Sequence, residues 1–258
     1  MNINKHCKEI EENGFTIIKN FLNKKKLNNV KKSLLEMLNY IEYSKEKDLQ
    51  KKYYEIKKKH PKLKSNFYDL AAHNIDMVKS IHSDQMVRLV KKYFNTNVLL
   101  SGRPAIHIHD DSNDKLLMPH QETNQFAVDI LLFWLPLWDT NKKTGGLTIY
   151  EKSHKHGYFE HTLKHPNLKN KAWTKKYTHV EKNIYSKFKR INLEVKAGSA
   201  VIAHSALLHC GYQNKSKNTV RIVITERFNP LLKIPFLKNP VSSKKIPYTG
   251  IDYNSIKV

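Results

Sequence analysis

The chain has 258 residues, of which 40% are hydrophobic, and it carries a formal net charge of +23. This apolar content is enough for a sizeable core, yet no stretch approaches the ~20 uninterrupted apolar residues of a membrane-spanning helix. The chain opens on a polar helical pattern without a signal-peptide core, and its two cysteines are too far apart to suggest a disulfide framework. We therefore expect a soluble, cytoplasmic protein with reduced thiols.

The positive charge has two explanations. It could attract an anionic partner, such as nucleic acid, acidic lipid, polysaccharide or a phosphorylated substrate. However, lysine is spread along the whole chain and greatly outnumbers arginine, without a recognition-helix or zinc-finger pattern. This distribution favours a compositional bias, so we expect no nucleic-acid partner, and an anionic substrate stays open.

The first part of the chain predicts helices and one strand. Residues 8–13 predict a helix that ends at Gly14, and residues 15–18 predict a short strand of β-branched and aromatic residues. A longer helix is predicted from Asn23 onward. Its apolar residues recur at three- and four-residue spacing: Leu27, Val30, Leu34, Leu38 and Ile41.

Two further helices are predicted before residue 96. Residues 43–64 are rich in lysine and glutamate, which indicates an exposed helix closed off by Pro61. Residues 84–94 predict another helix, with Ser83 or Asp84 as its N-cap.

From about residue 96 the pattern changes to short strands separated by turn signals. Predicted strands lie within residues 98–108, 126–138, 147–150, 191–195, 199–203 and 220–225. Many short strands with such breaks indicate a β-sandwich or barrel rather than alternating β–α units. We predict a single domain, 1–258, mainly β with α: a helical part at about 1–95 packed on a jelly-roll core at about 96–230, then a C-terminal tail, 231–258. Residues 156–190 form a long connection of the kind that often serves as a lid.

Residues 118–123, Met-Pro-His-Gln-Glu-Thr, contain the central chemical motif. In an extended strand, residues two apart point to the same face, so His120 and Glu122 can converge on one metal ion. The best third ligand is His209, which we expect near the end of a strand that opens at Gly198. Two histidines and one carboxylate, with open positions on the metal, form the ligand set of non-haem Fe(II) oxygenases.

Arg221 follows His209 by twelve residues, on a strand otherwise filled by valine and isoleucine. Facing inward, it would need a partner, and the carboxylate of a co-substrate could form a bidentate, charge-assisted pair with it. Facing outward, it would pair with a surface acid, and Arg103 and Arg227 would then be the first alternatives for the co-substrate anchor.

The ordered set of motifs resembles the phytanoyl-CoA dioxygenase family of Fe(II)/2-oxoglutarate-dependent oxygenases. The resemblance rests on residues 13–15, 119–122, 133–139, 145–147, 152–157, 204–209 and 221–222. It implies that His120, Glu122 and His209 bind Fe(II), that Arg221 binds the distal carboxylate of 2-oxoglutarate, and that O2 is consumed. It also implies the family's double-stranded β-helix, a cupin-like jelly roll.

Three positions depart from the family pattern. Glu122 stands where the family usually has aspartate, and its longer arm is still a competent ligand. Arg221 lies one residue further from the second histidine than is usual. Gly211 stands where a small hydroxyl residue is often found.

Other residues are secondary candidates. His107 and His109 form a second same-face pair, which together with Arg103 could line the barrel mouth, and His107 is a candidate contact of co-substrate or substrate. Trp134 is either core or a neighbour of the co-substrate, as the matching family position implies. The remaining histidines are interpreted as strand-end, turn, surface or lid residues: His154, His156, His161, His165, His179 and His204.

The expected function is that of an Fe(II)/2-oxoglutarate-dependent dioxygenase. The preferred reaction is hydroxylation of an unactivated C–H bond, with release of succinate and CO2. Its substrate would be a small molecule, lipid or sugar. Glu122 argues against a halogenase, in which the resemblance implies a missing carboxylate. The alternatives are a non-catalytic jelly-roll binding protein and a basic nucleic-acid-binding protein.

Overall fold

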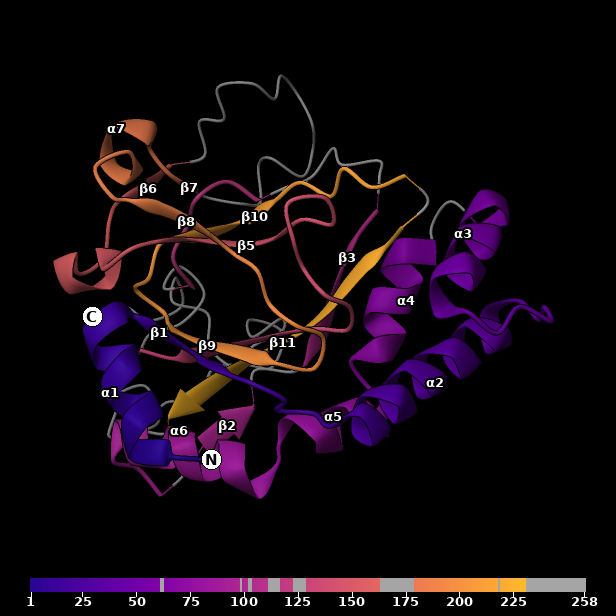
Figure 1. Cartoon of the computed structure of the whole chain (residues 1–258), viewed down its shortest axis with the longest axis horizontal. Coiled ribbons are helices and arrows are strands. Elements are labelled where there is room, and N and C mark those ends of the chain that lie inside the picture. The colour runs from indigo at the N-terminus through magenta and orange to yellow at the C-terminus, as the bar shows by residue number, and fades with distance from the viewer. Residues whose placement is uncertain are drawn as a thin grey trace, which may run out of the picture.

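The computed structural model describes residues 1–60, 63–97, 99–101, 104–110, 117–122, 129–162, 179–217 and 219–230 (Figure 1). The helices are α1 (Ile3–Asn13), α2 (Lys24–Ile41), α3 (Leu49–Lys59), α4 (Leu63–Ala71), α5 (Ile75–Ile81), α6 (Asp84–Phe94) and α7 (Lys182–Tyr185), with a 3₁₀ turn, η2 (Ser153–His156). The strands are β1 (Phe15–Ile18), β2 (Leu99–Ser101), β3 (Ala105–His109), β4 (Leu131–Pro136), β5 (Gly146–Tyr150), β6 (His161–Thr162), β7 (His179–Val180), β8 (Arg190–Leu193), β9 (Ala200–His204), β10 (His209–Tyr212) and β11 (Arg221–Pro230).

Local signals explain the predicted helices. Asn2 and Asn23 cap α1 and α2 by accepting a hydrogen bond from the backbone three residues on. Gly14 ends α1 with φ at +83°, a left-handed conformation that glycine adopts readily. The helices predicted at 8–13, after Asn23 and at 84–94 are confirmed, although α1 begins earlier, at Ile3.

The helix predicted at 43–64 is present, but the prediction that it is exposed is wrong. Within these residues α3 spans only Leu49–Lys59 and buries Lys52, Tyr53 and Ile56, and Pro61 lies outside the described residues. Lys52 is buried because its alkyl stem packs inward while its ammonium reaches the hydroxyl of Ser44 at 2.8 Å. Lysine content alone was therefore a poor guide to exposure, and α4 and α5 were not predicted.

Among the described residues, the strands form two main antiparallel sheets and a small two-stranded sheet. The larger sheet has six strands in the order β1-β9-β4-β11-β2, with β3 also paired to β11. The smaller sheet has the order β10-β5-β8, and β6 pairs with β7. Residues 98–108 hold two strands rather than one, and β11 continues five residues beyond the predicted end at residue 225.

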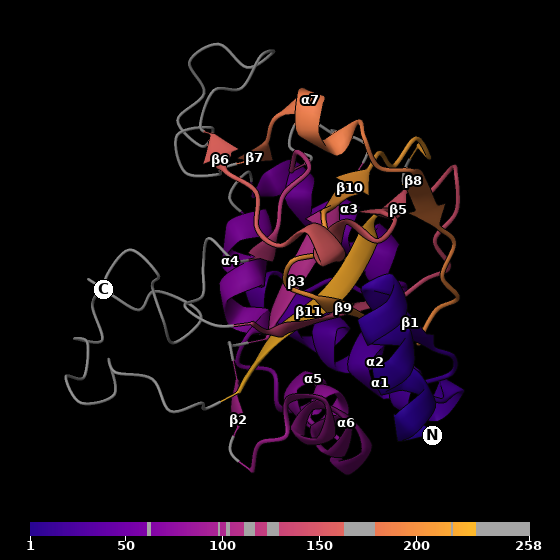
Figure 2. The same ribbon diagram turned by 90° about the vertical axis from the view of Figure 1, so that its left-hand side faces the viewer.

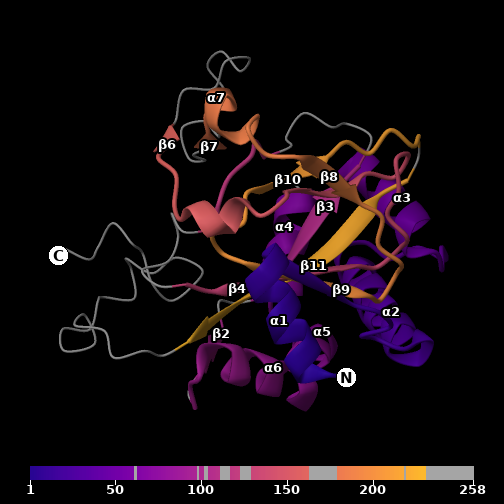
Figure 3. The same cartoon turned by 60° about the vertical axis from the view of Figure 1, so that its left-hand side comes forward.

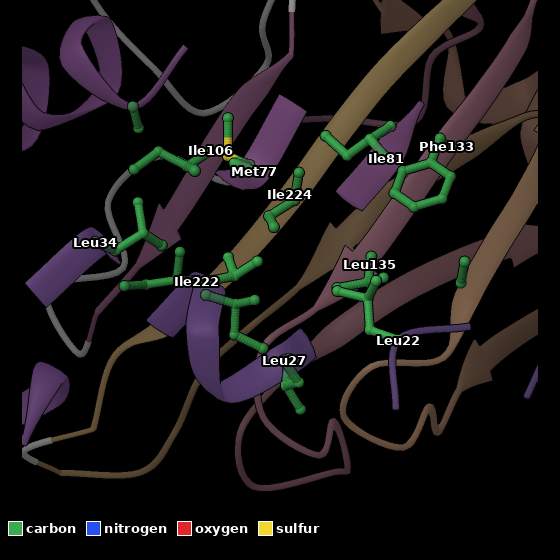
Figure 4. Close-up of a cluster of buried hydrophobic side chains, with 14 of the residues drawn as sticks. Leu22, Leu27, Leu34, Met77, Ile81, Ile106, Phe133, Leu135, Ile222 and Ile224 are labelled. Atoms are coloured by element: carbon green, nitrogen blue, oxygen red, sulfur yellow. The ribbon is translucent and has the colours of Figure 1, made fainter. Parts of the chain in front are cut away.

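Side-chain alternation on the larger sheet separates two apolar layers. Ile222 and Ile224 of β11 pack with the helices in the main core, whereas Val223 between them packs with residues of the smaller sheet. Figure 4 shows the helix-facing layer, where Phe133 and Leu135 of β4 lie with residues of the helices. In Figures 2 and 3, α1, α2, α5 and α6 lie on one side of β11, and β5, β8 and β10 lie on the other.

This arrangement confirms a mixed α and β structure whose sheets are antiparallel and stacked. No helix of the described part of the chain is long and apolar enough to cross a membrane.

Candidate metal centre and adjoining cavity

The structure brings His120, Glu122 and His209 together. One potential ligand atom from each lies within 4.8 Å of the others. His120 and His209 form an isolated antiparallel bridge with two backbone hydrogen bonds of 3.0 Å, and the Glu122 amide donates to the Ser205 carbonyl at 3.0 Å. Residues about ninety positions apart in sequence are thus held together by the main chain.

Two expectations about the backbone at this site are wrong. His120 and Glu122 do not lie on a regular strand, because His120 makes only a single bridge and Glu122 belongs to no strand. His209 does not end the strand that opens near Gly198; that strand, β9, ends at His204, and His209 begins β10 after a turn. The ligands converge because the loop bearing His120 adds a bridge at the end of β10.

Both imidazoles present the same nitrogen to the site. Nδ1 of His120 donates to the Met118 carbonyl at 2.7 Å, and Nδ1 of His209 donates to the Leu207 carbonyl at 2.9 Å. A carbonyl can only accept, so each ring carries its proton on Nδ1 and leaves Nε2 as a lone-pair donor. Such hydrogen bonds fix the tautomer and orientation of metal-binding histidines.

The surroundings of His120 and Glu122 favour the protonation states that bind a metal ion. Burial lowers the pKa of His120 to about 3, with a further contribution from His209, so the ring is neutral near pH 7. Burial alone would raise the pKa of Glu122, but Arg227 and the two histidines outweigh it and lower that pKa well below its ordinary value. A neutral imidazole and an ionised carboxylate are the forms that bind a metal ion.

Gln121, between two of these residues, anchors the loop from its opposite side. Its Nε2 donates to the carbonyls of Ala206 at 2.6 Å and Gly157 at 2.9 Å, and its amide nitrogen donates to Nε2 of His161 at 3.1 Å. No motif or spacing in the sequence marks Gln121 as a site residue. However, Gln121 lies between two ligand candidates expected on one face, so its side chain must point to the opposite face. That position alone indicated a role in holding the loop.

The structure describes some of the histidines in the 156–190 connection. His161 on β6 is half-buried and contacts the ligand loop through Gln121, while His179 on β7 is buried rather than at the surface. The Val180 amide donates to the Pro119 carbonyl at 2.8 Å, so the β6–β7 strand pair contacts this loop. His165 lies outside the described residues.

A cavity of about 520 Å³ adjoins the triad. Its lining includes the three ligand candidates and also Arg221, Trp134 and His107. Trp134 is buried on β4 opposite Thr225, and His107 is half-buried on β3 with its ring centroid 6.4 Å from that of Tyr68. Arg103 lies outside the described residues.

Arg221 faces inward and is only 4% exposed. Its Nη1 donates to the carbonyls of Tyr212 at 3.1 Å and Gly146 at 3.3 Å, whereas its buried Nε has no hydrogen-bond partner. Within the described part of the chain no carboxylate pairs with it, and burial lowers the pKa of Arg221 to about 10, so it stays charged. An outward arginine paired with a surface acid is therefore not what the structure contains.

Arg227, which the sequence offers only as an alternative anchor for the co-substrate, contacts the carboxylate of the triad instead. It lies six positions after Arg221 on the same strand, and its guanidinium bonds to both oxygens of Glu122. Side chains alternate along β11, so Arg221 and Arg227, six positions apart, point to the same face. This alternation was the sequence feature that could have placed Arg227 near the site.

Gly145 offers a test of the cavity wall around Arg221. A Cβ at Gly145, where φ is +72°, would lie 2.6 Å from Nη1 of Arg221 and 2.5 Å from the Tyr212 carbonyl oxygen. We expect Gly145→Ala to displace the guanidinium and weaken binding of a carboxylate co-substrate by roughly tenfold, since a charge-assisted hydrogen bond contributes ~1.5–3 kcal/mol.

The control for this prediction is Gly157→Ala, where φ is also +72° but a Cβ would meet nothing within 4 Å. It carries backbone strain without contact with Arg221, so its 2-oxoglutarate dissociation constant, measured by calorimetry, should match that of the wild type. Equal affinities in all three proteins would show that the wall at Gly145 does not position Arg221.

Two histidines and one carboxylate at one end of a two-sheet antiparallel framework make the donor set of a mononuclear metal site. The model of one family, phytanoyl-CoA dioxygenase (PhyH), matches residues 10–223, which is most of the chain. The chain therefore belongs to the phytanoyl-CoA dioxygenase family, as its motifs predicted.

Solved structures share this fold at low sequence identity. The epimerase SnoN, in complex with Fe3+, alpha ketoglutarate and nogalamycin RO, matches with a TM-score of 0.60 and 13% identity over 93% of this chain and 91% of its own. EvdO2 from Micromonospora carbonacea var. aurantiaca, complexed with 2-oxoglutarate, has a TM-score of 0.59 and 10% identity over 90% and 92%. AviO1 from Streptomyces viridochromogenes Tue57 has a TM-score of 0.57 and 11% identity over 91% and 97%. No curated protein matches by sequence.

Proposed function

We propose that the protein is an Fe(II)/2-oxoglutarate-dependent dioxygenase, with His120, Glu122 and His209 as iron ligands and Arg221 as the anchor of the co-substrate carboxylate. The observation that carries this proposal is a pair of features in one cavity: a triad of metal-binding side chains and a buried guanidinium whose Nε has no partner. Family membership and neighbours solved with Fe3+ and 2-oxoglutarate support it.

The residues present fit these groups. Two Nε2 lone pairs and an ionised carboxylate suit Fe(II), and a cation inside a cavity suits a dicarboxylate. When bound, iron with 2-oxoglutarate and O2 supplies the oxidising power that breaks an unactivated C–H bond, releasing succinate and CO2. The chain's own part is to hold the ligands in fixed tautomers and to exclude water, with Trp134 and His107 lining the space beside the co-substrate.

Hydroxylation is the proposed outcome, because Glu122 keeps the carboxylate ligand in place. Neighbours in the family fold include proteins named as an epimerase and a carbocyclase, so product analysis must decide the outcome for this chain. The cavity of about 520 Å³ is within the range of small-molecule sites, which supports a small-molecule, lipid or sugar substrate.

Three further parts of the proposal concern the whole chain. We infer that the two stacked sheets close into a double-stranded β-helix, and that residues 1–258 form one domain. Cys7 and Cys210 are both buried and unpaired, which supports a reducing, cytoplasmic location.

The proposed function is tested by anaerobic addition of Fe(II) and then 2-oxoglutarate to the purified protein. We expect a metal-to-ligand charge-transfer band on addition of 2-oxoglutarate, and succinate formation once O2 and a suitable substrate are admitted. Binding of both without succinate formation across a broad substrate screen would favour the non-catalytic binding protein. Failure to bind Fe(II) would contradict the proposal altogether.

The salt dependence of kcat/KM tests whether the net charge of +23 has a role in substrate capture. Because screening is strong above ~0.1 M salt, recruitment of an anionic substrate by surface lysines would make kcat/KM fall steeply as salt rises. We expect instead a change of less than roughly threefold between 0.05 and 0.2 M salt, on the view that the charge is compositional. A fall of roughly a hundredfold would show that the charge serves substrate capture.

A further inference from the structure

Arg227 is bound to the carboxylate of Glu122 in a two-pronged arrangement. Its Nε donates to Oε2 of Glu122 at 3.2 Å, and its Nη2 donates to Oε1 at 3.4 Å. The third nitrogen, Nη1, donates to the hydroxyl of Thr225 at 3.3 Å. The guanidinium is therefore held on both sides, by the carboxylate and by its own strand.

The two oxygens of Glu122 have different surroundings. Oε1 lies 3.4 Å from Nε2 of His209, one of the two nitrogens that would bind the metal. Oε2 makes the shorter of the two contacts with Arg227. The Glu122 side chain is 3% exposed and that of Arg227 13%, so little water competes for either oxygen.

We propose that Arg227 is a positioning residue that reserves Oε2 of Glu122, so that this carboxylate gives the metal one oxygen, Oε1, rather than two. The inference rests on the proposed function. A carboxylate that binds through both oxygens occupies two positions on the metal, and the proposed reaction needs positions for a chelating co-substrate and for O2. Arg227 keeps one of them open.

The length of Glu122 increases the effect of such a partner. Glutamate has one more rotatable bond than the aspartate usual in this family, so its carboxylate can swing between one- and two-oxygen binding. A planar guanidinium matches the carboxylate geometry and restricts that motion. Arg227 thereby compensates for the longer arm.

The alternative role for Arg227 is to bind the co-substrate or an anionic substrate directly. Arg221 fits that role better, because its Nε is unpartnered whereas two of the three nitrogens of Arg227 are bound to Glu122. Arg227 would have to release Glu122 in order to bind another anion.

The test uses Co(II) binding to the full chain, followed by calorimetry and by the visible absorption of the bound ion, which reports its coordination. Arg227→Gln should weaken Co(II) binding by roughly ten- to a hundredfold, as loss of a partner that orients a metal ligand typically does. Its Co(II) absorption should change shape as Glu122 becomes a two-oxygen ligand. Arg227→Lys, which keeps the charge but loses the fork, should show the same change in a milder form.

The matched control is Arg221→Gln, on the same face of the same strand but without contact with Glu122. It should keep wild-type Co(II) affinity and absorption while binding 2-oxoglutarate more weakly. An unchanged absorption shape in both Arg227 variants, whatever their affinity, would overturn the inference and leave the proposed function standing. Absence of Co(II) binding by the wild type would overturn both. A cooperative thermal unfolding transition checks that each variant is folded. If Arg227→Gln does not fold, the test relies on Arg227→Lys.

Discussion

Replacing His209 by alanine should abolish metal binding. The wild type should hold about one Fe(II) per chain, the stoichiometry of a site with two histidines and one carboxylate. Without the Nε2 of His209, only His120 and Glu122 would face the ion, and loss of a direct ligand should cost more than the roughly ten- to hundredfold that loss of an outer partner costs. His120→Ala should have the same effect, since both rings present Nε2.

Iron content after anaerobic loading and desalting measures this result. His73→Ala, which alters an exposed histidine between α4 and α5, is the control and should retain the wild-type iron content. The triad would be misassigned if a His120→Ala, His209→Ala double variant held iron as tightly as the wild type.

Replacing Arg221 should weaken 2-oxoglutarate binding while metal binding stays intact. Arg221 is buried at the cavity with an unpartnered Nε, so a carboxylate bound there would complete its hydrogen bonding. Lysine keeps a charge but cannot make a two-pronged contact. Loss of a charge-assisted pair costs on the order of 1.5–3 kcal/mol, so we expect the dissociation constant to rise roughly ten- to a hundredfold in Arg221→Lys, and further in Arg221→Ala.

Titration of the Fe(II)-loaded variants with 2-oxoglutarate, followed by the charge-transfer band, measures the effect separately from turnover. Unchanged affinity in both Arg221 variants would show that the anchor lies elsewhere. Arg103 would then be tested first, because Arg227 already pairs with Glu122.

The sequence by itself determined the local elements and the identity of the ligand candidates. Caps such as Asn23 and stops such as Gly14 act within one helical turn, so their effect can be read without knowledge of the fold. The alternation of β11 likewise placed Arg221 on one face of a strand, although which face was buried stayed open. The ordered motifs from His120 to Arg221 were enough to predict the family, which the match over residues 10–223 confirms.

Only the tertiary structure decided how these residues meet. The bridge between His120 and His209, and the hydrogen bond from Glu122 to Ser205, depend on the register of segments far apart in sequence. The hydrophobic pattern within one segment does not specify which residues of a distant segment it pairs with. For this reason the predicted strand positions of His120 and His209 were wrong. The pairing of Arg227 with Glu122 has the same origin: β11 extends five residues beyond its predicted end, and a partner more than a hundred positions away lies beside it.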